Sequence, residues 1–227
     1  MKKIHILMAA MLLSMTMQAQ TPQDLRDSLS KATNELAYHP DSISLRLKKA
    51  GWNIRLQQWE YAKDDLDKVL YQNPKNIAGL FYRAFVNDKL MRFNFARLDY
   101  QNLLVLIPGN FEAQLGLSLL NQKDKHYTEA YDGINMLVEQ YPDSAEAWAA
   151  RAGIEKERNM LETAVYDYSK AHELDSKNID YITNMLDIHI TLKESEAALD
   201  DINKLTKLGV KPGALREFRD RLKKIKK

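Results

Sequence analysis

A spacing of 34 residues recurs along most of the chain and carries two sets of residues, one of alanines and one of prolines. The alanines are Ala62, Ala96, Ala130, Ala164 and Ala198, and the prolines are Pro40, Pro74, Pro108 and Pro142, with Ser176 at the fifth place. Two registers with one period indicate that a single structural unit is repeated. A period of this length restricts the chain to an array of stacked units.

We expect five complete units, each with two helices of about 14 residues joined by a short turn. The repeats cover residues 41–212, at 43–76, 77–110, 111–144, 145–178 and 179–212. Residues 20–40 are predicted to form an N-terminal cap helix, which starts at Thr21 and Pro22 because these residue types favour the first positions of a helix. Residues 213–227 are predicted to form a basic C-terminal cap helix that covers the other end of the stack.

Within one unit the residue types follow a fixed order. Counting from the first residue of the fourth repeat, Trp148 is at place 4, Ala152 at place 8, Ala164 at place 20 and Tyr168 at place 24. Small side chains let the two helices of a hairpin approach closely, and large ones fill the seam beside them. This pattern resembles the tetratricopeptide repeat family. The resemblance implies an all-α, right-handed superhelical solenoid of helical hairpins, whose first helices form a concave wall that binds peptides or partner proteins.

The resemblance also implies that places 2, 5, 9, 12 and 13 of each unit face the concave wall. Apolar residues stand at several of these places. The predicted partner-binding residues are Leu47, Phe81, Phe85, Leu115 and Leu119, with Tyr82 and Lys89 as polar companions. An exposed apolar surface of this size indicates an interface. The alternative is that these side chains pack between adjacent first helices, and the sequence leaves both interpretations open.

Charged residues inside the repeats are interpreted as solvated. At place 7, Lys49, Arg83 and Arg151 are expected to pack their stems and to leave their charged heads in water. Acidic pairs on the second helices, such as Asp64-Asp65, are expected on the outer face of the stack.

The sequence shows no catalytic arrangement. It has no Gly-rich phosphate loop, no G-x-S-x-G or H-E-x-x-H motif and no cysteine. No two of the five histidines have metal-ligand spacing on one helix face, and His189 at place 11 is interpreted as a structural histidine. We therefore expect a protein that is not an enzyme and holds no metal or cofactor.

Residues 1–19 are predicted to be a secretory signal peptide. Lys2 and Lys3 form its positive start, and cleavage is expected near the small residue Ala19. The apolar stretch between them is shorter than the ~20 residues that span a bilayer, so no membrane span is expected after cleavage. The chain has no cysteine for a disulfide or a lipid anchor, and a bacterial periplasm fits better than full secretion.

Beyond those two lysines the chain holds 31 basic and 31 acidic residues, a balance that predicts no nucleic-acid partner. The sequence therefore favours a non-enzymatic interaction scaffold, or adaptor, of the cell envelope that binds a protein or peptide partner in its groove. The alternative is a homo-oligomeric structural subunit that self-associates through the groove or the last repeat, where Leu186 at a small-residue place predicts looser packing. A weaker hypothesis gives the basic end helix a membrane-surface or acidic-partner role.

Overall fold

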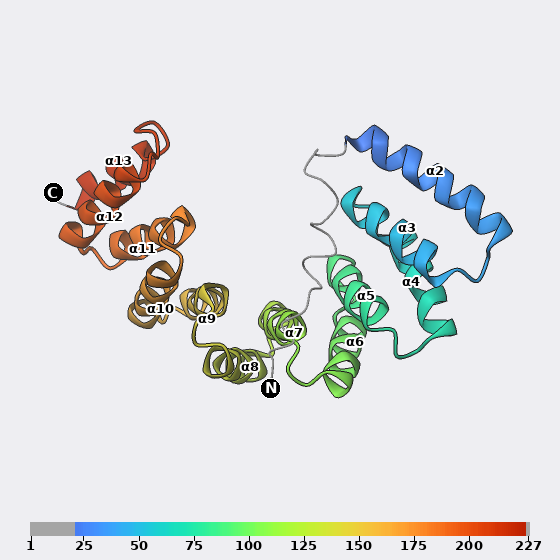
Figure 1. Ribbon diagram of the computed structural model, residues 1–227. Helices are drawn as coiled ribbons and strands as arrows, with labels where there is room; N and C mark the ends of the chain where they lie inside the picture. The colour runs from blue at the N-terminus through green and yellow to red at the C-terminus, as the bar shows by residue number, and fades with distance from the viewer. Residues whose placement is uncertain (1–20, 226–227) are drawn as a thin grey trace. The chain divides into compact units, whose positions relative to one another are not determined.

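The computed structural model describes residues 21–225 of the chain. The predicted signal peptide 1–19 lies outside the described residues, as do Lys226 and Lys227. Within the described range the structure has twelve helices and no strand (Figure 1). The expected all-α fold is therefore confirmed. The chain divides into two compact units, the first ending at Ala113 and the second beginning at Gln114, and each is described by itself.

The first unit is a series of helices in which each packs against the next along the chain. Its helices are α2 (Pro22–Tyr38), α3 (Ile43–Arg55), α4 (Trp59–Gln72), α5 (Ile77–Lys89) and α6 (Phe93–Leu106). The helix α7 (Phe111–Lys123) begins in the first unit and continues into the second. Hence α3 with α4 and α5 with α6 form two antiparallel hairpins, and α2 covers α3.

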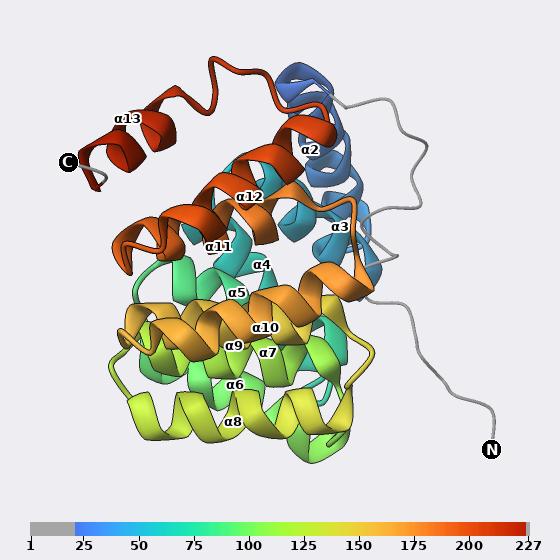
Figure 2. The same cartoon turned by 90° about the vertical axis from the view of Figure 1, so that its left-hand side faces the viewer.

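The second unit continues the same plan. Its further helices are α8 (Tyr127–Gln140), α9 (Ala145–Glu157), α10 (Leu161–Leu174), α11 (Ile179–Thr191), α12 (Ser195–Lys207) and α13 (Arg216–Ile225). Helices α8 to α12 pack in chain order, and Figure 2 shows α8, α9 and α10 running side by side. The odd-numbered helices α7, α9 and α11 are the first helices of their hairpins.

Each first helix is started by a short polar side chain. These residues accept a hydrogen bond from a backbone N–H two or three residues further on, which satisfies a group that the helix leaves unpaired. They are Ser42, Asn76, Asn110, Ser144 and Asn178, at the same 34-residue spacing as the alanines. The start of every hairpin is therefore encoded locally.

The turn inside each hairpin is also repeated. One residue in each turn adopts a left-handed backbone conformation with φ between 57° and 61°. These residues are Gln57, Met91, Lys125, Asn159 and Lys193. None is glycine, although the conformation is one that side chains disfavour. This fourth register of 34 residues has no constant residue type, so it could not be detected in the sequence.

Ion pairs in the seam of the hairpins correct two expectations. Arg83 donates to both carboxylate oxygens of Asp99, at 2.9 and 2.7 Å, and the ammonium of Lys49 lies 3.1 Å from the carboxylate of Asp65. The two aspartates are only 1–2% exposed. The prediction of solvated cationic heads at place 7 was therefore wrong, as was the assignment of Asp65 to the outer face. Antiparallel packing brings residues 16 apart together, which linear spacing does not show.

The last repeat is closely packed. Leu186 is fully buried in a cluster with Leu205 and Leu222, so the expectation of looser packing there is wrong. The apolar face of α13 contributes to the same cluster, and the guanidinium of Arg221 donates to Asp187 at 2.8 Å. Because this face is covered by the last hairpin, it is not available to insert into a membrane surface. Over residues 21–225, no helix is both long and apolar enough to cross a bilayer.

Candidate functional site

The structure places five of the seven predicted partner-binding residues in the first unit, where their own neighbours cover them in part. The ring of Phe85 meets the edge of Trp59 at a centroid distance of 6.1 Å, and the ammonium of Lys89 lies 5.0 Å from the Phe85 centroid. The ring of Phe81 meets that of Tyr82 at 5.8 Å. The two phenylalanines are therefore partly used for packing within the unit.

Three residues of the same wall are likewise covered only in part by their neighbours. Leu47, Tyr82 and Phe85 pack on a buried cluster of small and branched side chains, yet all three remain half-buried. Burial raises the pKa of the Tyr82 hydroxyl, so this group stays protonated at neutral pH. In the first unit the half-burial of these three side chains is compatible with both interpretations that the sequence leaves open.

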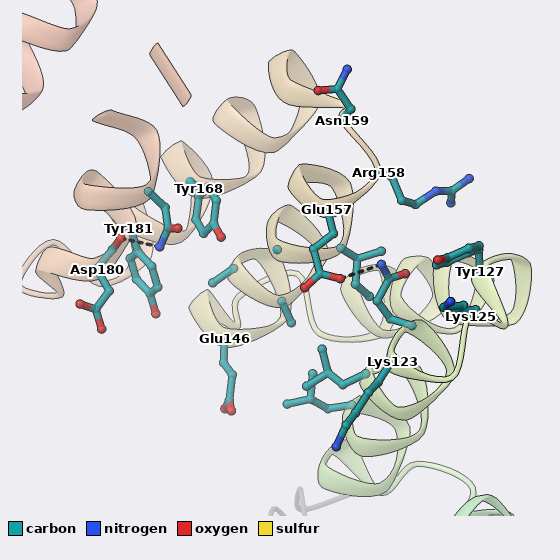
Figure 3. Close-up of a pocket in the computed structure, with 18 residues that line it drawn as sticks. Lys123, Lys125, Tyr127, Glu146, Glu157, Arg158, Asn159, Tyr168, Asp180 and Tyr181 are labelled. Carbon is teal, nitrogen blue, oxygen red and sulfur yellow. Dashed lines mark hydrogen bonds between the residues drawn. The ribbon is translucent and has the colours of Figure 1, made fainter. Parts of the chain in front are cut away.

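The other two predicted residues, Leu115 and Leu119, line an open hollow of about 1170 Å³ in the second unit (Figure 3). The hollow lies along the first helices α7, α9 and α11. Six of its residues stand at places 2, 5 and 9 of their repeats, which were expected to face the concave wall. They are Glu146, Asp180, Leu115, Ala149, Leu119 and Gly153. This volume of about 1170 Å³ lies just above the range of about 300–1,000 Å³ that is usual for small-molecule sites, which leaves room for a longer ligand.

The floor of the hollow is open because its residues are small. Ala149 and Gly153 lie on α9 one turn apart, so this part of the helix presents no bulky side chain. A Cβ built on Gly153 would meet only the hydroxyl of Tyr168, at 3.8 Å. Burial and the nearby charge of Glu157 raise the pKa of Tyr168 to about 12, so its hydroxyl is a stable neutral donor or acceptor at the floor.

Two opposite sides of the hollow carry opposite charges. Figure 3 shows Lys125, Tyr127 and Arg158 on one side and Glu146 and Asp180 on the other, with Lys123 between them and its ammonium directed toward the side of Glu146. The basic residues stand at or just after the ends of α7 and α9, whereas the acidic ones are in the first turns of α9 and α11. The charges are therefore separated along the direction of the first helices.

The carboxylates of the acidic side oppose ionisation of the neighbouring tyrosine, Tyr181. Burial raises the pKa of Tyr181, and the negative charges of Asp175, Glu146 and Asp180 raise it further. A tyrosine whose ionisation is opposed by several carboxylates reports a negative potential at that side of the hollow. This side is therefore suited to a cationic group of a ligand.

An amide in the wall of the hollow is only partly satisfied. Gln122 is 8% exposed, and its Nε2 donates to Glu157 at 2.8 Å. Its Oε1 is buried and accepts no hydrogen bond. A buried acceptor without a donor is costly, and such groups often mark places where a water or a ligand completes the structure.

Residues 21–225 contain no group of three or more His, Cys, Asp or Glu side chains that could hold a metal ion. His189 has its Nδ1 2.6 Å from the buried carboxylate of Asp201 inside the last hairpin, away from the lining of the hollow. The arrangement of the hollow favours binding of a chain segment through apolar contact and charge.

Of the residues that line the hollow, only Leu115 and Leu119 were predicted from the sequence to bind a partner, and none of the polar ones was. The missed residues include Gln122, Glu146, Glu157 and Asp180, which stand at places 12, 2, 13 and 2 of their repeats. Applying the expected wall places to polar as well as apolar residues would have found them. The loop residues Lys125 and Arg158 lie beyond those places, and only the folded turn brings them to the hollow.

Comparison with known proteins gives the fold but not a family model, since no model of a protein family matches the chain. Among curated proteins, human sperm-associated antigen 1 is 28% identical over 112 residues, which are 48% of this chain and 12% of that protein. The human peptidyl-prolyl cis-trans isomerase FKBP4 is 30% identical over 96 residues, 41% of this chain and 21% of that protein. The chain thus spans less than a quarter of the length of these relatives.

Solved structures match over most of the chain. PilW, described as a type IV pilus biogenesis factor, aligns with a TM-score of 0.72 at 16% identity, over 90% of this chain and 92% of PilW. A tetratricopeptide repeat protein from Parabacteroides merdae aligns with a TM-score of 0.70 at 21% identity, over 88% and 78%. YrrB aligns with a TM-score of 0.56 at 16% identity, over 78% and 91%. The chain therefore has the tetratricopeptide repeat fold, as its 34-residue pattern predicted.

Proposed function

We propose that this protein is a non-enzymatic adaptor of the bacterial cell envelope that holds a peptide segment of a partner protein. The observation that carries the proposal is the hollow of the second unit, which combines an apolar wall at Leu115 and Leu119 with a floor of small residues. The fold supports a role in protein interaction. YrrB is described as a tetratricopeptide repeat protein with an unusual peptide-binding site, and PilW as a pilus biogenesis factor.

Burial of apolar side chains in the hollow contributes to the free energy of binding such a segment. Covering apolar surface supplies about 25 cal/mol per Å², so one inserted leucine or aromatic side chain contributes about 1.5–3 kcal/mol. Leu119 is 44% exposed, which leaves much of its surface for a partner to cover. Two such side chains contribute about 3–6 kcal/mol, less than the roughly 8.2 kcal/mol of micromolar binding, so backbone hydrogen bonds and charge contacts must supply the rest.

A peptide-display selection on the purified chain tests this function. The wild type is expected to enrich apolar-centred peptides, and Leu119→Asp to enrich none of them because a carboxylate replaces apolar surface in the hollow. Leu199→Asp is the matched control, since Leu199 is an equally exposed leucine, also 44%, that lies on α12 outside the hollow. The proposal fails if the wild type enriches no peptide, or if both variants retain the same peptides.

The location in the envelope is tested separately. Residues 1–19 have the charge and apolar pattern of a signal peptide, which supports export to the periplasm. Expression of the full chain in a bacterium with a periplasm, followed by fractionation and mass determination, is expected to give a periplasmic product cut near Ala19. A full-length product that remains in the cytoplasm would contradict export.

Self-association is a second candidate function, and one observation favours it. The outer face of α6 in the first unit exposes Phe95 (64%), Leu98 (53%) and Val105 (79%) in one stripe. An apolar stripe on a helix face is a common mark of an interface. Sedimentation at several concentrations is expected to show a dimer that Phe95→Asp dissociates, if this function is correct. A monomer at all concentrations would exclude it.

A further inference from the structure

We infer that the hollow of the second unit selects an extended segment of about six residues with an apolar centre, an acidic residue at one end and a basic residue at the other. This inference rests on the proposed peptide-binding function and deepens it by stating the chemistry of the partner. The acidic end faces Lys125 and Arg158, and the basic end faces Glu146 and Asp180.

The first step is the placement of the charges. Lys125 and Asp180 are exposed side chains, on opposite sides of the hollow in Figure 3. Arg158 is also exposed, and its guanidinium rests 5.0 Å from the ring centroid of Tyr131, which orients it without neutralising it. Glu157 lies between the two sides in Figure 3, and the hydrogen bond that it accepts from the neutral amide of Gln122 leaves its negative charge in place. Opposite potentials on the two sides favour a partner whose charges are ordered in the complementary sense.

The second step is the distance between the charged sides. Glu146 lies in the first turn of α9 and Arg158 directly follows its last residue. A helix rises about 1.5 Å per residue, so these residues are about 18 Å apart along the axis. An extended chain covers that distance in about five or six residues, whereas a helical partner would need about twelve.

The third step is the volume. An extended segment 18 Å long occupies roughly 860 Å³, taking about 4.8 by 10 Å as its cross-section. A helix of equal length and a diameter of 10–12 Å occupies roughly 1400–2000 Å³. The hollow holds about 1170 Å³. The extended segment therefore fits within it.

The middle of the hollow fits the apolar centre of such a segment. Leu115 and Leu119 supply apolar surface on one wall, and Gly153 leaves space for a partner side chain on the floor. An extended backbone also presents N–H groups along its length. One of these could reach the unpaired Oε1 of Gln122 after a rotation of the amide, which would satisfy a buried acceptor that now has no donor.

Six-residue peptides with blocked ends test the inference by calorimetric titration against the mature chain. One peptide has Lys first and Glu last, a second has the reverse order, and a third has Gln at both ends, all with the same four apolar residues between. One charged order is expected to bind about five- to tenfold more tightly than the neutral peptide, since each exposed charge pair contributes about two- to fivefold. This preference is expected to vanish in 1 M salt, where charges are screened beyond about 3 Å.

Two charge variants locate the effect. Lys125→Glu is expected to abolish the preference for the tighter charged order and to leave binding of the neutral peptide unchanged. Lys193→Glu is the matched control. Lys193 stands at the same place two repeats later, has the same left-handed backbone conformation and lies outside the hollow. The control is expected to bind as the wild type does.

The inference is overturned if the neutral peptide binds as tightly as both charged ones, or if both charge orders bind equally. It is also overturned if a twelve-residue helical peptide with the same charges binds more tightly than the six-residue one. In these cases binding that is still blocked by Leu119→Asp leaves the proposed function intact. If no peptide binds and the display selection enriches none, the proposed function fails together with the inference.

Discussion

Replacing Glu155 by Gln is expected to remove a large part of the pH dependence of this protein's stability. Glu155 is 2% exposed on α9, and its Oε1 accepts a hydrogen bond from the hydroxyl of Tyr131 at 3.2 Å. It faces Asp167, whose carboxylate is held by the guanidinium of Arg151. Burial raises the pKa of Glu155 to about 7, and the charge of Asp167 adds to the shift while Arg151 opposes it.

The sign follows from the folded and unfolded pKa values. In the unfolded chain the pKa is near 4.5, so between that pH and about 7 the folded protein keeps a proton that the unfolded chain has lost. The free energy of unfolding is therefore highest in mild acid and falls as the pH rises through 7. The interval between pKa values of 4.5 and about 7 corresponds to at most about 3.4 kcal/mol, and we expect about 1–3 kcal/mol because the carboxyl of Glu155 is strongly coupled to its charged neighbours.

Glutamine should resemble the protonated glutamate at this position. In the second repeat the corresponding residue is Asn87, whose amide donates to Asp99 at 3.4 Å. A glutamine amide at position 155 can donate to Asp167 in the same way. The variant is therefore expected to lie within about 1 kcal/mol of the wild type at pH 5 and to be about 1–3 kcal/mol more stable at pH 8.5.

Urea unfolding followed by circular dichroism at the two pH values measures this difference, since urea does not screen charges. Glu157→Gln is the control, because Glu157 lies two residues away on the exposed side of the same helix and should leave the pH dependence unchanged. A stability difference between Glu155→Gln and the wild type that is the same at pH 5 and pH 8.5 would refute the reasoning.

Three further substitutions can be followed by the same unfolding measurement. Arg83→Met should lower the free energy of unfolding by about 3 kcal/mol, because it leaves the buried carboxylate of Asp99 without its cation; a loss below 1 kcal/mol, on the order of an exposed ion pair, would contradict this. Gly133→Ala should cost about 1–3 kcal/mol, since its new Cβ would lie 2.6 Å from the hydroxyl of Ser118, and a neutral result would show that the serine moves away freely. Met91→Gly should stabilise by about 0.5–1 kcal/mol because it relieves a left-handed conformation at φ 59°, whereas destabilisation would mean that the methionine side chain makes important contacts.

Much of the fold could be predicted because its signals are local. The alanines at place 20, such as Ala62 and Ala164, are fully buried where two helices meet, and Asn76 and Ser144 accept the hydrogen bonds that begin first helices. A period of 34 residues in such signals leaves few architectures for the chain. The type and order of the helices follow from it.

The candidate site was only partly predictable. Leu115 and Leu119 could be assigned to the wall from their repeat places, and the structure puts both in the lining of the hollow. Phe81 and Phe85 have the same places one repeat earlier, yet their rings are half-covered by Tyr82 and by Trp59. At place 9 the exposure differs, because Phe85 is half-buried beside the large ring of Trp59 whereas Leu119 is exposed.

The sequence by itself determined that this protein is an all-helical array of hairpins, since helix starts, close-contact alanines and the repeat length are properties of neighbouring residues. Only the tertiary structure decided where charge is buried and where it is offered to a partner. Asp99 and Asp167 are buried because antiparallel packing brings a cation 16 residues away into contact with each. Arg158 and Asp180 belong to different hairpins, and stacking of those hairpins places both at one hollow.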